Sequence, residues 1–114
     1  MELLTTATIV GIKSNMTELL FRNRLVLSET AFVEIAIWRI PRPLRGSSHA
    51  YKYRLALVAD GVCVLRYDNE TGKGDHKHVG DREVGYTFTD LKALQAHFWH
   101  DVETWRRKYE DSDA

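Results

Sequence analysis

The chain has 114 residues, of which 16 are basic and 16 are acidic, so its formal net charge is zero. This length suits one domain with one modest core, and a hydrophobic content of 44% is ordinary for a soluble globular protein. No apolar run approaches the roughly 20 residues of a membrane span, and the neutral charge does not indicate a polycation that coats nucleic acids. Because Thr5, Thr6 and Thr8 interrupt the apolar N-terminal segment, we expect no signal peptide and a cytoplasmic protein.

The N-terminal residues predict the start of a sheet. Residues 1–15 alternate weakly between apolar and polar side chains, so we treat them as an N-terminal extension or an extra strand. A single domain at residues 16–114 follows. Within residues 17–27, two apolar groups are separated by the polar segment Arg22-Asn23-Arg24. This pattern predicts a short strand, a turn and a second short strand.

The middle of the chain predicts two further strands. Residues 32–40 are the clearest strand, because β-branched and aromatic side chains dominate there and alternate. The segment Pro41-Arg42-Pro43 ends it, since proline has no N–H to donate to a ladder. Residues 51–59 form the next strand, and the alternation places Lys52 and Arg54 on the same face of it.

A cationic block precedes the most polar part of the chain. Between Glu34 and Asp60 there is no acidic residue, but there are five basic ones, which indicates an anion-binding patch or a charged strand edge. The dipeptide Asp60-Gly61 is a strong signal for a type I′ hairpin turn. Residues 62–68 therefore return as the partner strand, and the cationic strand should lie beside residues 67–78.

The spacing of apolar residues predicts one long helix at residues 90–109, with Thr89 or Asp90 as its N-cap. Its apolar stripe, at steps of three and four residues, consists of Leu91, Leu94, Phe98, Val102, Trp105 and Tyr109. The sequence therefore predicts an α+β fold. We expect an antiparallel sheet of five to six strands packed against one long C-terminal helix.

The candidate functional segment is residues 67–78, which we interpret as a loop. It contains three carboxylates, two lysines, two histidines, a tyrosine and an asparagine, together with two glycines that make it deformable. Cleavage of RNA needs a base near the 2′-hydroxyl, an acid near the leaving oxygen and cations near the phosphate. The loop and the neighbouring cationic strand offer these groups.

In this metal-free interpretation the two histidines transfer protons. In an extended segment, the spacing of His76 and His78 places both rings on one side, about 6.5–7 Å apart at the backbone, so that they could flank a phosphate. Asp75 would orient one ring, and Lys52, with the other cations, would hold the phosphate. The side chains to which we assign catalysis are His76, His78, Asp75, Arg54 and Lys73.

Two other interpretations of the same segment stay open. Asp68, Glu70 and Asp75 offer oxygen ligands for Mg²⁺ or Mn²⁺, and His76 with His78 could bind a softer ion such as Zn²⁺. However, no ligand template is matched and lysines are interspersed, so we expect no metal ligands and no cofactor. Alternatively, the segment is a solvated, charged turn whose histidines lie at the surface.

Four blocks of the sequence carry a family resemblance: residues 19–23, 32–41, 47–55 and 67–78. In this order they resemble the TumE family of small prokaryotic toxins, and the likeness covers about residues 17–107. It implies that the domain at 16–114 is toxin-like. The motif residues also include side chains that we expect to bind substrate, namely Lys52, Tyr51, Tyr67, Asp68, Asn69 and Glu70.

The resemblance implies the toxin of a type II toxin–antitoxin system. Its expected partners are an RNA substrate and a helix-turn-helix antitoxin, and it could form a homodimer or a hetero-oligomer with that antitoxin. The general architecture would be RelE-like or barnase-like, and small toxins of this architecture often cleave RNA without metal. A metal-independent ribonuclease is therefore the expected activity. The alternatives are a metal-dependent nuclease or phosphoesterase and a non-enzymatic toxin that binds a protein or DNA.

Overall fold

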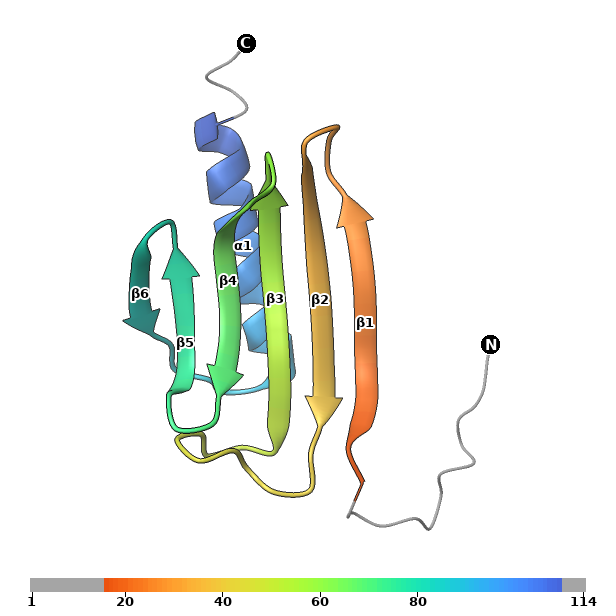
Figure 1. The fold of residues 1–114 in the computed structure, drawn as a ribbon, viewed down its shortest axis with the longest axis vertical. Helices are drawn as coiled ribbons and strands as arrows, with labels where there is room; N and C mark the ends of the chain where they lie inside the picture. Colours follow the sequence, from red (N-terminus) through yellow and green to blue (C-terminus); the bar gives the residue numbers. More distant parts are fainter. Residues whose placement is uncertain (1–15, 110–114) are drawn as a thin grey trace, which may run out of the picture.

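The computed structural model describes residues 16–109, which form a six-stranded antiparallel sheet with one helix packed against it (Figure 1). The strands lie in chain order, so each one pairs with the next. Their bounds are β1 Glu18–Val26, β2 Ala31–Arg39, β3 Tyr51–Ala59, β4 Val62–Glu70, β5 Gly74–Val79 and β6 Arg82–Gly85, and the helix α1 spans Leu91–Tyr109. The predicted α+β class is confirmed, whereas the strand expected in residues 1–15 lies outside the described residues.

The sheet has two different faces, because side chains alternate along each strand. One face packs against α1 and carries most of the core. The buried cluster consists of Val33, Ile35, Ile37, Tyr53, Leu55, Leu57, Leu65, Tyr67, Leu94, Phe98 and Val102. We call the opposite face of the sheet the open face. Lys52 and Arg54 lie on the open face, as their alternation with buried Tyr53 and Leu55 predicts.

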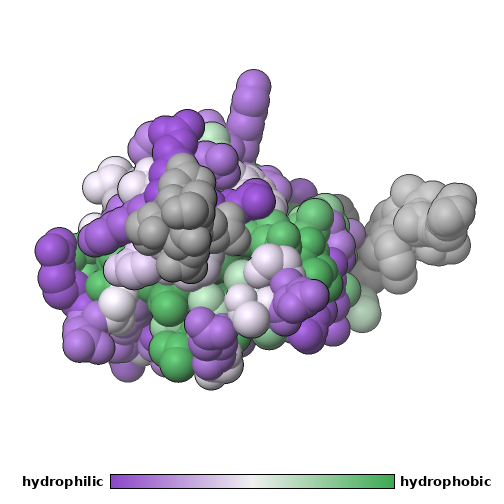
Figure 2. Space-filling model, turned by 90° about the horizontal axis from the view of Figure 1, so that it is seen from above, coloured by the Kyte–Doolittle hydropathy of each residue, from purple (hydrophilic) through white to green (hydrophobic). Residues whose placement is uncertain are grey.

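The helix begins as the sequence predicts, and most of its predicted apolar stripe packs against the sheet, whereas Tyr109 is 50% exposed. The Asp90 carboxylate accepts a 2.7 Å hydrogen bond from the Ala93 N–H and so caps the first turn. Leu94, Phe98 and Val102 are buried against the sheet. Figure 2 shows apolar side chains between the sheet and the hydrophilic outer surface of the helix. No helix within residues 16–109 is both long and apolar enough to span a bilayer.

The turn predicted at Arg22-Asn23-Arg24 is wrong, because β1 runs through these residues without interruption. They pair in register with β2, where Arg24 lies opposite Glu34 and forms a 3.3 Å ion pair with it. β1 is an edge strand and most of its side chains are exposed. Polar residues therefore cost little there and do not indicate a turn.

The hairpins that follow β3 decide where the candidate site lies. Asp60 and Gly61 both have positive φ, 52° and 77°, as a type I′ turn requires, so this prediction is confirmed. By contrast, the loop predicted over residues 67–78 is a second hairpin, in which β4 and β5 are joined by a short turn around Gly72. A third hairpin joins β5 to β6. Its turn consists of two residues, Gly80 and Asp81.

The burial of α1 generates a prediction about stability. Leu94 is 0% exposed, so we expect Leu94→Ala to lower the free energy of unfolding by about 2–5 kcal/mol through lost burial and a residual cavity. Leu19, which is 49% exposed in β1, provides a matched control. The same substitution there should cost less than about 1 kcal/mol. Urea unfolding followed by circular dichroism measures both values, and equal losses would contradict this packing of the helix.

Candidate functional site

The register of the sheet builds a polar row across the open face. Ala36 lies opposite Arg54, Arg54 opposite Asp68, and Asp68 opposite His76, so one cross-strand row joins β2 to β5. Residues directly opposite each other on one face have Cβ atoms roughly 5 Å apart. The predicted proximity of the cationic strand to the acidic and histidine-rich segment is therefore confirmed for Arg54, Asp68 and His76.

Asp68, His76 and His78 form a compact cluster on the open face. His76 Nε2 lies 2.7 Å from Asp68 Oδ1, and the two imidazole rings meet edge to face with 5.0 Å between their centroids. One ligand atom from each of the three residues lies within 4.8 Å of the others. Asp68 and His76 are buried and His78 is half-buried. We call these three residues the Asp-His-His cluster.

The ring orientation of His76 is fixed by the backbone. Its Nδ1 lies 3.0 Å from the Gly74 carbonyl oxygen, which can only accept a hydrogen bond, so Nδ1 carries a proton. Nε2 is therefore the atom that faces Asp68. Gly74 can hold its carbonyl in this place because it adopts a φ of +76°, a value that side chains disfavour.

Three long charged side chains surround the Asp-His-His cluster. Arg66 Nε lies 3.0 Å from Asp68 Oδ2, the carboxylate oxygen that does not face His76. Glu83 Oε2 lies 3.6 Å from His76 Nε2 and 3.3 Å from Lys73 Nζ. The ammonium of Lys73 is the main cause that lowers the pKa of the Glu83 carboxyl below its usual value. Arg66 and Glu83 are not among the site residues predicted from the sequence, because strand register and not sequence spacing brings them here.

A groove of about 520 Å³ continues the open face toward β1. Its walls come from β1, β2 and β3, and the lining residues are Arg22, Asn23, Arg24, Glu34, Ile35, Ala36, Trp38 and Arg54. Lys52 Nζ lies 5.6 Å from the centre of the Trp38 ring, next to this groove. The groove therefore gives the polar row a cationic and aromatic extension, which suits a chain of phosphates and bases.

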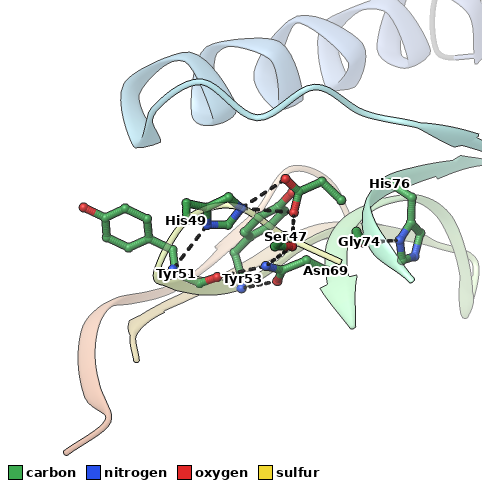
Figure 3. A network of polar contacts seen from close by, with 8 residues as sticks. Ser47, His49, Tyr51, Tyr53, Asn69, Gly74 and His76 are labelled. Atoms are coloured by element: carbon green, nitrogen blue, oxygen red, sulfur yellow. Dashed lines mark hydrogen bonds and ion pairs between the residues drawn. The ribbon is translucent and has the colours of Figure 1, made fainter. Parts of the chain in front are cut away.

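Asp75 lies on the helix face of β5, away from His76 and His78. Its carboxylate accepts a 2.8 Å hydrogen bond from Ser47 Oγ and lies 3.0 Å from His49 Nε2 (Figure 3). The His49 ring stacks on Phe88 with 3.8 Å between centroids. Asp75 therefore orients His49, not one of the two histidines for which the sequence analysis proposed it.

Asn69 and Tyr51 also belong to the helix face. Asn69 is 2% exposed, accepts a hydrogen bond from the Tyr53 N–H and donates one to the Tyr51 carbonyl oxygen. Its amide thus closes the β3–β4 ladder beyond the pair Arg54 and Asp68. Figure 3 shows that this amide and the His49 contacts form one network. We infer that this network holds the loop that precedes β3 against strand β5.

Tyr67 is buried under the helix. Its hydroxyl donates a 2.5 Å hydrogen bond to Asp101 Oδ2, to which Lys77 Nζ is 3.0 Å distant. Burial first, and then this hydrogen bond, raise the pKa of Tyr67 well above its usual value. Tyr67 is only 1% exposed, so in this conformation it has no surface on which a base could stack.

The expected site residues thus divide between the two faces. The open face unites Lys52, Arg54, Asp68, His76 and His78, with Lys73 and Glu70 at the exposed β4–β5 turn. The helix face holds Tyr51, Tyr67, Asn69 and Asp75. The alternation of strand residues was the available signal for this division. It was hidden because the segment was taken for a loop.

Comparison with known proteins identifies a family. The model of a protein family described as Toxin TumE matches residues 6–106. A search of curated proteins and a search of solved structures each found no match. The matched residues include the Asp-His-His cluster on the open face and the hydrogen-bond network on the helix face.

The buried Tyr67 hydroxyl generates a prediction about pH. In the unfolded chain a tyrosine ionises near pH 10, whereas the raised pKa keeps Tyr67 protonated in the folded chain. Its contribution to stability is complete below pH 10 and decreases above it by up to about 1.4 kcal/mol per pH unit. Urea unfolding between pH 9 and 11 should show a shallower decrease for Tyr67→Phe than for the natural protein. Equal slopes would contradict the raised pKa.

The contact between Gly74 and Gly46 generates a second prediction. A Cβ on Gly74 would lie 2.7 Å from the Gly46 carbonyl oxygen, whereas a Cβ on Gly61 meets nothing within 4 Å. Both glycines have a φ near +76°, so an alanine is strained by a similar amount at each position. Gly74→Ala should therefore cost at least about 1 kcal/mol more than Gly61→Ala because of the backbone clash. Thermal unfolding of the two variants measures the difference.

Proposed function

The chain belongs to the TumE toxin family, and from this premise we propose that it is the toxin of a toxin–antitoxin pair that cleaves RNA phosphodiesters on its open face. The observation that carries the proposal is the cross-strand row of Arg54, Asp68 and His76, with His78 beside it. It combines a cation for the phosphate with groups able to move protons. The toxin would act in the cytoplasm, where RNA is present.

Substrate binding follows from the charge on this face. Arg54 lies in the row itself, and Lys52 lies two residues before it in β3, on the same face. Lys73 lies at the β4–β5 turn. Arg22 and Arg24 line the adjoining groove. The protein as a whole is neutral, so RNA affinity would come from this local cationic surface and weaken as salt is added.

Two routes use this centre for cleavage. In the metal-free route, predicted from the sequence, one imidazole takes the proton of the 2′-hydroxyl and the other protonates the leaving oxygen, while Arg54 stabilises the charge on the phosphate. An acid and a base for such a displacement act from different sides of the phosphorus. In the metal-dependent route, Asp68, His76 and His78 would hold an ion, which would supply stabilisation of the developing charge or activation of the nucleophile.

One observation favours the metal-dependent route. One ligand atom from each of Asp68, His76 and His78 lies within 4.8 Å of the others, and Asp68 Oδ1, His76 Nε2 and His78 Nε2 are buried. This convergence suits a single ion better than two imidazoles that flank a phosphate.

The proposed antitoxin is a helix-turn-helix protein, and the complex would be a hetero-oligomer or contain a toxin homodimer.

The proposal predicts the effect of removing one imidazole. We expect His78→Ala to lower the rate of RNA cleavage by about 100-fold or more and to abolish growth inhibition. His100, which is exposed on α1, provides a control of the same residue type. His100→Ala should cleave RNA and inhibit growth as the natural chain does.

Cleavage of a labelled RNA by the purified proteins measures the rates, and circular dichroism shows that each variant is folded. Full activity of His78→Ala would remove the assigned role of the histidine. If the natural chain inhibits growth but leaves RNA intact, a non-enzymatic toxin that binds protein or DNA would replace the ribonuclease proposal.

A further inference from the structure

We propose that Asp68, His76 and His78 bind one divalent transition-metal ion of the zinc class. The use of this ion in RNA cleavage rests on the proposed function, whereas its binding does not. Two imidazole nitrogens and one carboxylate oxygen are a ligand set found at protein sites for zinc and for non-haem iron.

The three ligand atoms lack hydrogen bonds, although two of them lie close to each other. Asp68 Oδ1, His76 Nε2 and His78 Nε2 are buried, and none of them makes a hydrogen bond among the described residues. His76 is only 3% exposed. Buried polar groups are nearly always satisfied by a partner, so three residues with such atoms, whose ligand atoms come within 4.8 Å of one another, indicate a shared partner.

The Nδ1–H of His76 donates to the Gly74 carbonyl oxygen, so in the neutral ring the Nε2 lone pair faces Asp68 Oδ1 at 2.7 Å. With the ring neutral, these two acceptors repel each other unless a cation lies beside them. The pair does not have the directional geometry of a hydrogen bond. A cation placed off the line between the two atoms satisfies both lone pairs.

The groups behind the ligands hold them in orientations that suit metal binding. A metal-binding histidine usually donates its other N–H to a carbonyl or carboxylate, which fixes the ring, and the Gly74 carbonyl does this for His76. Arg66 holds Asp68 Oδ2 at 3.0 Å and leaves Oδ1 turned toward the histidines. Because Asp68 and His76 are paired across adjacent strands, the backbone fixes their separation before any ion binds.

The ligand types select the class of ion. Imidazole nitrogens suit zinc, copper, iron and nickel, whereas magnesium and calcium prefer oxygen ligands alone. Three protein ligands leave a coordination position open for water or a phosphate oxygen. Glu83 Oε2, 3.6 Å from His76 Nε2, lies where it could act on a group bound in that position.

The test measures metal binding directly. The purified full chain is stripped with EDTA, dialysed and titrated with Zn²⁺ by calorimetry, and Co²⁺ absorption reports the ligand geometry. We expect one ion per chain and a rise in Tm of several degrees at saturating Zn²⁺. Asp68→Asn and His78→Ala should each bind Zn²⁺ about tenfold more weakly or worse. The control His100→Ala should bind it as the natural chain does.

The outcomes separate this inference from the proposed function. It is overturned if the folded natural chain takes up neither Zn²⁺ nor Co²⁺, or if His100→Ala loses as much affinity as His78→Ala. If the folded chain binds no ion and still cleaves RNA in EDTA, the metal site is overturned and the ribonuclease proposal is sustained. One bound ion with intact RNA would support the metal site and contradict the ribonuclease. Because Asp68→Asn keeps the shape of the side chain, a loss of affinity there does not depend on misfolding.

Discussion

The antiparallel pairing of β4 with β5 is the constraint on which the rest of the site depends. Side chains alternate between the two faces of a strand, so the register that sets Asp68 opposite His76 also sends Asn69 and Asp75 to the other face. A shift by one residue would exchange the two sets. The turn around Gly72 and the positive φ of Gly74 fix this register, and the clash that a Cβ would meet at Gly74 shows how little room the turn has.

The two polar sets therefore have different physical roles. On the helix face, two groups of polar side chains are enclosed by the core and the loop before β3 and have partners: Asp75 contacts Ser47 and His49, and Tyr67 contacts Asp101. Such matched groups add specificity to the packing because an unpaired buried group is costly. On the open face, the buried atoms of the Asp-His-His cluster lack hydrogen bonds. Unmatched buried atoms of this kind are expected where a protein binds something else.

The sequence was sufficient where local signals agree with the tertiary structure. The Asp60-Gly61 turn, the alternation of β3 and the apolar stripe of α1 each had one interpretation, and each is confirmed. The sequence was insufficient where polar residues occupy strands. Arg22 and Asn23 were taken for a turn because an edge strand has no burial to mark it, and β5 was taken for a loop because glycines and charges hid its alternation. The proximity of Arg54 to Asp68 followed from the hairpin, but the separation of Asp75 from His76 required the strand assignment.

Access to the open-face centre depends on side chains more than on the backbone. The cluster lies on paired strands, and its outer contacts come from Arg66 and Glu83, whose side chains are 28% and 41% exposed. Moving a long surface side chain from one rotamer to another costs on the order of 1 kcal/mol, far less than opening a strand. An incoming phosphate would compete with Glu83 for Lys73 and with Asp68 for Arg66. Each of the two cations could then pair with the phosphate in place of its carboxylate partner. In the proposed function, substrate binding would thus uncover the Asp-His-His cluster while the sheet register keeps its three proposed ligand atoms in place.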